Sequence, residues 1–345
     1  MRVLVRPFDV RSAYYSTTRP LWNEPRPAYV AQVRLGVPSF AMRRQTNSST
    51  PGFPFQWTRL VGMQHMLATD AYFVPLSWTD AETRAPMRDM FAELSEPSSR
   101  ANLSTLARSY LAALGLPDPD QDSATAELLW MHALAVGYSP AYLADNADGI
   151  AQDWPRIPLP RSRDTLLASA KLGHQVAALL DTETPVPGVT GGNVRPELHS
   201  VAVVSRAGGG SLRAEEFALT AGWGSGGQGG VTMPGRGRLE PRAPDAAEQA
   251  VWGAAPLLDV YLNEHAHWKN VPQAVWNFTI GGYQVIKKWL SYREQRVLGR
   301  ALTMAEIMEV TATARRLGAL VLLQGQLDAN YRACATSTWS ATAVE

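Results

Sequence analysis

An alternation between two kinds of sequence constrains the fold of this chain more than any other feature. Residues 1–78 and 184–279 are rich in β-branched and aromatic residues broken by proline or glycine, a pattern typical of short strands joined by long loops. Residues 98–182 and 280–332 carry the apolar spacing of helices, the latter with a capping box from Thr303 to Glu306. We therefore predict an α+β fold in which two β-rich lobes are joined and supported by the two helical segments.

This alternation divides the 345 residues into four sub-regions. They are a basic β-rich lobe over residues 1–95, a helical spacer over 96–183, a second β-rich lobe with glycine-rich loops over 184–279, and C-terminal helices over 280–335. Helices are predicted over residues 102–114, 124–136, 164–180, 283–293 and 303–323, with a further helix from Pro140 behind Ser139 as its N-cap. Strands are predicted at residues 200–205 and 216–220.

Charge is distributed unevenly along the chain although its net value is only +1. Residues 1–60 contain nine arginines and two acidic residues, whereas residues 61–160 contain five arginines and thirteen acidic residues. This asymmetry fits a protein that holds a polyanion on one face, although the two charge types could simply occupy different surfaces. The 28 arginines against four lysines suit recognition of guanine and phosphate, and they equally suit a GC-rich genome.

The N-terminus and the cysteine content indicate the compartment. The first twenty residues include Arg2, Arg6 and Asp9, where a signal peptide would need an uninterrupted apolar core. The single cysteine excludes an internal disulfide framework, and the longest apolar run, residues 317–323, is far shorter than a membrane span. We therefore predict a cytoplasmic protein.

Several catalytic motifs are missing because they require a lysine in a particular context. None of the four lysines follows a glycine, as a phosphate-binding P-loop requires, and none follows an acidic residue by two positions, as in many metal-dependent nucleases. No Asn- or Asp-Pro-Pro-aromatic sequence is present to hold a flipped adenine. The sequence therefore assigns no catalytic residue, and no enzymatic activity is expected of the chain by itself.

Two further patterns have weak support as ligand sites. Gly222, Gly224 and Gly227 match the dinucleotide-binding pattern Gly-x-Gly-x-x-Gly, but the glycines and proline that follow do not permit the required helix. His265 and His267 could bind zinc from a strand, but no third ligand is evident. We predict surface histidines and no metal site.

Three segments give a more specific signal when they are taken together. They are Arg6 to Tyr15 with Pro25 and Arg26, the predicted helix around residues 129–142, including 137–140, with 154–158, and residues 271–293 with 327–331. In this order and spacing they resemble the C-terminal specificity domain of type ISP restriction-modification enzymes, which are large single-chain bacterial defence proteins. Related enzymes that fuse a methyltransferase to a recognition domain share the first two segments, so the third narrows the family.

The resemblance implies a target-recognition domain that spans residues 1–345. In this family a nuclease, an ATP-driven translocase and an adenine N6-methyltransferase precede the region, so the chain, with its own Met1, is expected to begin just after the methyltransferase. The implied function is recognition of a double-stranded DNA sequence, which positions a methyltransferase or translocase from other domains or a partner chain. S-adenosylmethionine, ATP and Mg²⁺ would serve only those partners, and no cofactor is expected here.

Candidate DNA contacts follow from residue type and position. Ile280, Val285, Ile286, Trp289 and Leu290 form an apolar face on the third segment, while its lysines project elsewhere, as they also would on an ordinary solvated helix. The predicted contacts to the DNA backbone are Arg6, Arg11, Arg26, Lys287, Lys288 and Arg293. The predicted contacts to base edges are Arg43, Arg44, Gln45, Asn47, Arg236 and Arg238.

Two alternatives remain open at this stage. The chain could be a folded, non-functional remnant of a truncated restriction-modification gene, which would bind nothing tightly. It could also be an unrelated hydrolase or carbohydrate-binding module built on the two β-rich lobes, although the sequence suggests no pairing of a nucleophile with a base.

Overall fold

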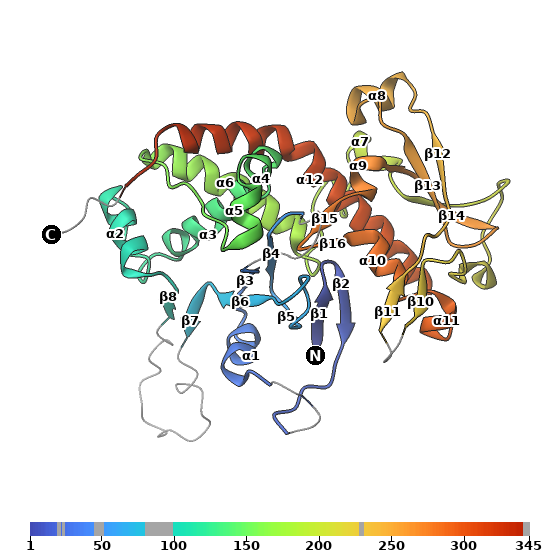
Figure 1. The fold of residues 1–345 in the computed structure, drawn as a ribbon, viewed down its shortest axis with the longest axis horizontal. Helices are drawn as coiled ribbons and strands as arrows, with labels where there is room; N and C mark the ends of the chain where they lie inside the picture. The colour runs from blue at the N-terminus through green and yellow to red at the C-terminus, as the bar shows by residue number, and fades with distance from the viewer. Residues whose placement is uncertain (19–21, 23–24, 45–51, 80–98, 228–230, 341–345) are drawn as a thin grey trace. The chain divides into compact units, whose positions relative to one another are not determined.

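Two groups of residues form separate units in the computed structural model (Figure 1). The structure describes residues 1–18, 22, 25–44, 52–79, 99–227 and 231–340. The first unit contains residues 1–5, 10–183 and 324–345, and the second contains residues 6–9 and 184–323. The second unit therefore includes a short turn from the N-terminal segment, and α12 (Met304–Thr336) contributes residues to both units.

Small sheets make up the strand portion of the first unit. One has the order β2-β1-β5, with β1 and β5 parallel and Val3 opposite Val61; another, β4-β3-β6, is antiparallel, and β7 pairs with β8. Phe40 on the central strand β3 packs against Phe55 on β4, so this sheet contributes to a hydrophobic core. The strands are β1 (Arg2–Arg6), β2 (Asp9–Ser12), β3 (Ser39–Met42), β4 (Phe55–Thr58), β5 (Val61–Gly62), β6 (Tyr72–Pro75), β7 (Ser77–Thr79) and β8 (Ser99–Ala101).

Local capping residues set where the first unit's helices begin. The side chains of Ser104, Asp122, Ser139 and Ser162 each accept a hydrogen bond from a backbone N–H in the first turn of the helix that follows. The helices are α1 (Pro27–Arg34), α2 (Thr105–Ala113), α3 (Ser123–Gly137), α4 (Pro140–Asp145), α5 (Ala147–Gln152), α6 (Arg163–Leu180) and the last part of α12.

A buried polar network joins α3 and α6, which pack against each other. His132 on α3 is fully buried, and its Nδ1 lies 2.7 Å from Ser169 Oγ on α6. Its Nε2 lies 2.9 Å from the carbonyl oxygen of Pro158. Because a carbonyl oxygen only accepts, Nε2 carries the hydrogen and Nδ1 accepts from the serine hydroxyl. Burial lowers the pKa of His132 to about 4, so the imidazole is neutral.

One sheet and two short hairpins make up the strand portion of the second unit. The sheet has the order β12-β13-β14-β9 and is antiparallel throughout. Trp268 on β14 is fully buried and its Nε1 donates to the carbonyl oxygen of Ile307 on α12, at 3.2 Å. The strands are β9 (Val203–Arg206), β10 (Gly224–Gly226), β11 (Thr232–Pro234), β12 (Leu239–Arg242), β13 (Leu257–Tyr261), β14 (Ala266–Pro272), β15 (Thr279–Ile280) and β16 (Tyr283–Gln284).

Short helices connect these strands, and the long helix α12 packs beside them. The capping box that the sequence predicts is present, since Thr303 N donates to Glu306 at 2.8 Å and Glu306 N donates to Thr303 Oγ1 at 3.2 Å. The helices are α7 (Pro196–His199), α8 (Ala246–Trp252), α9 (Gln273–Trp276), α10 (Val285–Ser291), α11 (Gln295–Leu298) and residues 304–323 of α12.

The structure confirms the predicted α+β class, with strands concentrated in the two segments expected to be β-rich. Several boundaries differ, including those of α2 (Thr105–Ala113, predicted at 102–114) and β9 (Val203–Arg206, predicted at 200–205), and one predicted element is absent. The last helix continues to Thr336 rather than residue 323, and α10 spans only Val285–Ser291. The predicted strand at 216–220 is wrong, because a 3₁₀ turn occupies Ala214–Phe217 and its Glu216 binds Arg206 at 3.0 Å. The finer division into four sub-regions stays a prediction.

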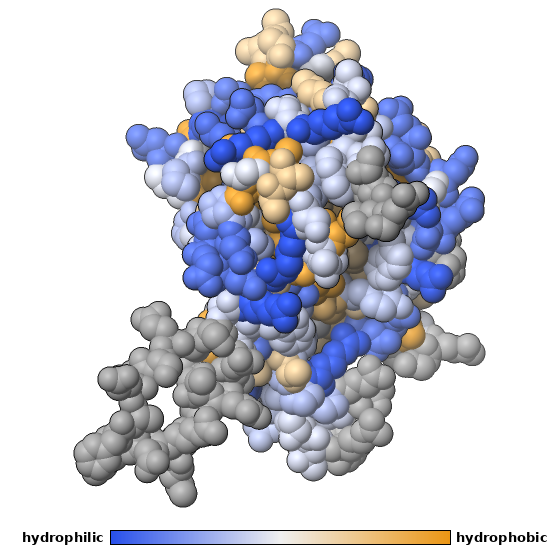
Figure 2. Space-filling view, turned by 90° about the vertical axis from the view of Figure 1, so that its left-hand side faces the viewer, coloured by the Kyte–Doolittle hydropathy of each residue, from blue (hydrophilic) through white to orange (hydrophobic). Residues whose placement is uncertain are grey.

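Among the residues that the structure describes, no helix is both long enough and apolar enough to cross a bilayer. Figure 2 shows the side of the molecule on which α2 lies, where hydrophilic residues cover most of the surface and hydrophobic residues appear between them in patches. Exposed hydrophobic residues scattered over a surface are ordinary in folded proteins. This face therefore does not by itself indicate a binding site.

Candidate nucleic-acid interface

A tight turn at residues 6–9 presents the first candidate side chain in the second unit. Phe8 adopts a left-handed backbone conformation with φ of 62°, and its side chain is 1% exposed. Such a conformation is unfavourable for a residue with a side chain, so the burial of Phe8 stabilises it. Asp9 is also buried and accepts a 2.8 Å hydrogen bond from Arg293 Nη2. The turn thus fixes the position of Arg6 beside the segment that contains Arg293.

A second tight turn orders the residues in front of α10. Gly281 and Gly282 have φ of 54° and 86°, and they connect β15 to β16, where Ile280 pairs with Tyr283. Two successive positive φ angles define a type I′ hairpin turn, which glycine adopts without strain. Behind the turn, Val285, Ile286, Trp289 and Leu290 are buried, as the apolar spacing predicts.

These two turns bring two cations onto the same pair of aromatic rings. The guanidinium carbon of Arg6 lies 5.1 Å from the ring centroid of Tyr283 and 5.7 Å from that of Tyr292. The Nζ atom of Lys288 lies 5.4 Å and 4.7 Å from the same two centroids. Arg6 Nη2 also donates to the Tyr292 hydroxyl at 3.1 Å. We call Arg6, Tyr283, Lys288 and Tyr292 the cation-aromatic cluster.

The cation-aromatic cluster has the chemistry of an anion-binding surface. An aromatic ring attracts a cation through its quadrupole but does not neutralise its charge. Among the described residues, neither Lys287 nor Lys288 forms an ion pair, and both are partly exposed. The surface of α10 therefore presents two lysine ammonium groups that remain able to meet a phosphate.

Arg293 differs from the other candidates on this segment. Its guanidinium lies 3.8 Å from the Trp289 ring centroid and binds Asp9, and its side chain is buried. Burial raises the pKa of the Glu309 carboxyl on α12, while the positive charge of Arg293 acts in the opposite direction. This environment indicates that Arg293 holds the turn at residues 6–9 against α10, with its guanidinium directed into the protein.

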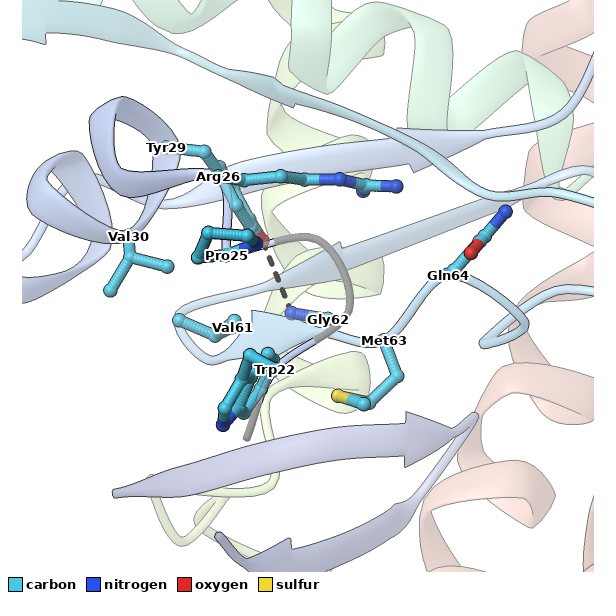
Figure 3. Close-up of a pocket in the computed structure, with 9 residues that line it drawn as sticks. All are labelled: Trp22, Pro25, Arg26, Tyr29, Val30, Val61, Gly62, Met63 and Gln64. Atoms are coloured by element: carbon cyan, nitrogen blue, oxygen red, sulfur yellow. Dashed lines mark hydrogen bonds between the residues drawn. The ribbon is translucent and has the colours of Figure 1, made fainter. Parts of the chain in front are cut away.

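The remaining candidates for contacts to the DNA backbone lie in the first unit. Arg11 is exposed on β2, and Arg26 precedes α1 with a left-handed φ of 44°. Arg26 lines a cavity of about 120 Å³ that is otherwise mostly apolar. In Figure 3 the Arg26 side chain extends toward the side on which Gln64 lies, and the Gly62 N–H donates to the Tyr29 hydroxyl at 3.2 Å. This cavity is small and apolar, so it does not resemble a phosphate site.

The candidates for contacts to base edges in the first lobe differ in how exposed their side chains are. The Arg43 residue is 3% exposed, so its guanidinium lies within the first unit. The Arg44 side chain is 65% exposed and lies 3.8 Å from Asp153, which is a weak surface ion pair. Gln45 and Asn47 lie outside the described residues.

The candidates of the second lobe are both exposed. Arg236 forms no side-chain hydrogen bond or ion pair among the described residues. Arg238 lies 4.0 Å from the Tyr261 ring centroid and donates from Nε and Nη2 to Glu240 Oε1, at 3.2 and 2.6 Å. Glu240 also accepts from the Tyr261 hydroxyl at 2.7 Å, and these hydrogen bonds lower the pKa of its carboxyl. Ring and carboxylate together hold Arg238 in one orientation.

Arg238 also borders an open cavity of about 550 Å³. Glu215, Glu264 and Asn263 are among the other residues that line it. Carboxylates and amides hydrogen-bond to the amino groups and edges of bases, whereas carboxylates repel phosphates. The cavity therefore differs in chemistry from the cation-aromatic cluster.

The histidine pair and the glycine motif have structural explanations. His267 is buried on β14, 3.5 Å from Asp259, so the prediction of a surface position is wrong for this residue, and burial lowers its pKa. Within the described residues no group of three potential ligands could hold a metal ion. The backbone N–H groups of Gly222 and Trp223 donate to the Glu294 carboxylate at 3.1 and 2.7 Å, so a protein side chain occupies the donors of the glycine motif.

Sequence reasoning missed the residues that hold these candidates in place. Four residues orient the candidate arginines and lysines and are not themselves candidate DNA contacts. They are Asp9, Tyr283, Glu240 and Tyr261. Tyrosines directly beside basic residues, as in the third segment, are a signal that could have suggested cation-aromatic contacts. The pairing of Asp9 with Arg293 has no local signal, because 284 residues separate them.

The fold and the site thus define a protein of the α+β class that presents cations on the surface of its second unit. Residues 1–316 match the family described as the type ISP C-terminal specificity domain, and the chain belongs to this family. The match is to the specificity domain alone. No curated protein sequence matches the chain.

Two solved structures have a similar fold. One is described as a cryo-EM structure of a DrdV-DNA complex, with a TM-score of 0.56 and 15% identity. The other is described as the ATP-dependent type ISP restriction-modification enzyme LlaBIII bound to DNA, with a TM-score of 0.54 and 11% identity. The similarity covers 95% and 96% of this chain but only 28% and 18% of those chains.

Proposed function

We propose that this chain recognises a sequence in double-stranded DNA and thereby positions an adenine N6-methyltransferase and translocase, supplied by other domains or by a partner chain. The observation that carries the proposal is the cation-aromatic cluster, which joins two segments shared with the specificity-domain family. Both structures of similar fold are described as complexes with DNA. Catalysis belongs, in this proposal, to the partner domains.

Contacts to the DNA backbone come from the cation-aromatic cluster and from Lys287 beside it. Lysine ammonium groups and an arginine on one face neutralise phosphates and so fix the position of the protein on the duplex. Arg11 and Arg26 are proposed as further backbone contacts from the first unit. Arg293 contributes indirectly, because its hydrogen bond to Asp9 holds the turn that carries Arg6.

Contacts to base edges come from Arg236, Arg238 and Arg44, which are exposed. An arginine whose orientation is already fixed loses less conformational entropy when it binds a guanine edge. Tyr261 and Glu240 supply that fixation for Arg238. Gln45 and Asn47 remain proposed contacts to base edges on residue type alone, and Arg43 is less suited to reach a base because it is buried.

The salt dependence of DNA binding tests the backbone contacts. We expect Lys287→Gln and Lys288→Gln each to weaken binding to every duplex by about tenfold, because a hydrogen bond to a charged group contributes about 1.5 kcal/mol. Each substitution should also reduce the slope of log affinity against log salt by about 1. Lys171→Gln is a matched control, since Lys171 is an exposed lysine on α6.

Two results would contradict the proposal. If the purified chain retards no duplex at low salt, alone or together with a cognate methyltransferase, the proposal is wrong and the interpretation as a folded remnant gains support. If Lys171→Gln reduces the slope as much as Lys288→Gln does, the cation-aromatic cluster is not the backbone-binding surface.

A further inference from the structure

The short hairpin formed by β10 and β11 has exposed hydrophobic side chains on one face. Its register places Gly224 opposite Pro234, Ser225 opposite Met233, and Gly226 opposite Thr232. Met233 lies on β11 and Val231 lies directly before this strand, two residues away, so an extended chain places their side chains on the same face. Val231 is 59% exposed and Met233 is 53% exposed.

The facing strand provides almost nothing to cover these two side chains. It consists of Gly224, Ser225 and Gly226, and the next residue, Gly227, donates its N–H to the Val231 carbonyl oxygen at 2.7 Å. A Cβ atom at Gly227 would lie 3.0 Å from Met233 Cγ, so the methionine side chain lies directly over a glycine. The result is a thin two-stranded ribbon with a hydrophobic face open to solvent.

The base of the hairpin is firmly attached to the second unit. Arg296 Nε donates to the Gly224 carbonyl oxygen at 2.8 Å, and Trp223, which is fully buried, donates from Nε1 to the Tyr261 carbonyl oxygen at 2.7 Å. A Cβ atom at Gly224 would lie 2.0 Å from the Ser291 carbonyl oxygen, so glycine is required for this close approach. The hairpin thus projects from a fixed base beside α10 and α11 (Figure 1).

Three cations near the hairpin, Arg236, Lys287 and Lys288, are exposed or partly exposed and form no ion pair among the described residues. The neighbouring acidic residues are bound within the protein, since Glu240 binds Arg238 and Glu294 accepts from the N–H groups of Gly222 and Trp223. The helix α10, which carries both lysines, packs against both strands of the hairpin. A hydrophobic ribbon flanked by cations is complementary to a DNA groove, where phosphates border the stacked bases.

We infer that the β10–β11 hairpin enters the major groove of DNA and that Val231 and Met233 contact the 5-methyl groups of thymines. The major groove admits a two-stranded β-ribbon, and the thymine methyl is the hydrophobic feature of its floor. This inference rests on the proposed function and makes it more specific, because it assigns part of the sequence preference to hydrophobic contact rather than to hydrogen bonds.

The experiment compares loss of the protein side chain with loss of the DNA methyl group. A preferred site is first selected from randomised duplexes with the full chain, and each thymine in it is then replaced singly by deoxyuridine, which removes only the methyl. Affinities are measured for wild type, Val231→Ser and Met233→Ser. Met304→Ser is a matched control, because Met304 on α12 is also half exposed.

We expect wild type to lose about fourfold in affinity at one or more deoxyuridines, the loss that one buried methyl group predicts. Val231→Ser or Met233→Ser should lose a similar factor on the thymine duplex and nothing further on the corresponding deoxyuridine duplex. The salt slope should not change, in contrast to Lys288→Gln. Met304→Ser should bind like wild type.

Several results would overturn the inference while leaving the proposed function intact. They are a selected site without thymine, unchanged affinity in both hairpin variants, or losses that simply add to those of deoxyuridine. Hairpin variants that keep DNA affinity but lose retention of a partner protein would make the ribbon a protein-binding surface instead. Failure of wild type to bind any duplex would overturn the proposed function and this inference with it.

Discussion

The segments that carry the sequence resemblance form two clusters of opposite electrostatic character, one in each unit. In the first unit, Asp328 Oδ1 accepts hydrogen bonds from Ser139 Oγ at 2.6 Å and from Ala141 N at 2.9 Å, at the start of α4. In the second unit, Lys288 lies over the rings of Tyr283 and Tyr292 and has no acidic partner among the described residues. The first cluster satisfies its charge within the protein, and the second directs charge outward.

This difference separates stability from binding within one set of family motifs. A carboxylate at a helix N-terminus stabilises the helix and is satisfied by the backbone. A lysine held only by aromatic rings contributes little to folding but keeps its charge available for a phosphate. Substitutions in the first cluster should therefore change stability alone, and substitutions at exposed cations of the second should change DNA binding alone.

A substitution of Arg293 is the strongest test of this separation. Arg293 lies in the same sequence segment as Lys288 and Tyr292 of the second cluster, but its side chain is buried. Arg293→Ala leaves Asp9 as a buried carboxylate without its arginine, and breaking a buried ion pair in this way costs about 3–5 kcal/mol. We expect the unfolding transition to shift to much lower urea concentration, measured by tryptophan fluorescence. Arg213→Ala, at an exposed pair 4.0 Å from Glu215, should cost less than about 0.5 kcal/mol.

A different result would place Arg293 with the binding residues. If Arg293→Ala unfolds like the Arg213→Ala control and instead reduces the salt slope of DNA binding, its side chain reaches DNA as the sequence alone suggested. The separation between the two clusters would then hold for exposed residues only.

The next largest expected effect is a difference between the two units in how their stability depends on pH. Burial lowers the pKa of His132 from about 6.5 when unfolded to about 4 when folded, so the unfolded chain binds more protons between these values. Stability of the first unit should therefore fall as pH falls from about 6.5 to about 4, by up to about 3 kcal/mol. Urea unfolding at pH 7, 6 and 5 measures this, and His132→Gln should remove most of the dependence.

The second unit should respond in a lower pH range. Hydrogen bonds from Arg300, and from Thr303, lower the pKa of Glu306 to about 2. The contribution of Glu306 to the stability of the second unit is present above the unfolded pKa of about 4.5 and is lost as pH falls toward 2.

The prediction for the first unit fails if the His132→Gln variant keeps the full loss of stability between pH 6.5 and 4. Another group would then be responsible for the acid sensitivity, and not the imidazole of His132.

Local signals in the sequence were sufficient for the class of fold and for many helix boundaries. Ser139 before Pro140 and Thr303 before Glu306 mark helix starts through hydrogen bonds that span three residues, and the structure has both. The strand predicted at residues 216–220 failed because five residues of mixed polarity carry little information about period. Distant contacts such as Asp9 with Arg293 carry no local signal, since the fold alone brings them together.

The sequence proposes candidate interface residues by their type but does not predict which of them are exposed. Arg43 and Arg44 are neighbours with the same side chain, yet the first is buried and the second is exposed. Burial depends on which strand packs over which helix, so composition and charge cannot separate such a pair. The sequence singles out the cations of the third segment as a group, but the contact of Lys288 with Tyr283 and the difference between the partly exposed Lys288 and the buried Arg293 are evident only in the structure.

Asp328→Asn should have the smallest effect and tests the first cluster directly. An asparagine oxygen can still accept from Ser139 or Ala141, so the change removes mainly the negative charge at the N-terminus of α4 and should cost about 1 kcal/mol. Asp145→Asn, at the other end of α4, is the matched control and should not destabilise, because a negative charge there is unfavourable. Both variants should keep the wild-type salt slope for DNA binding. A reduced slope in Asp328→Asn would mean that the two clusters do not act independently, because a substitution in the first cluster would then change the number of phosphates that the protein neutralises.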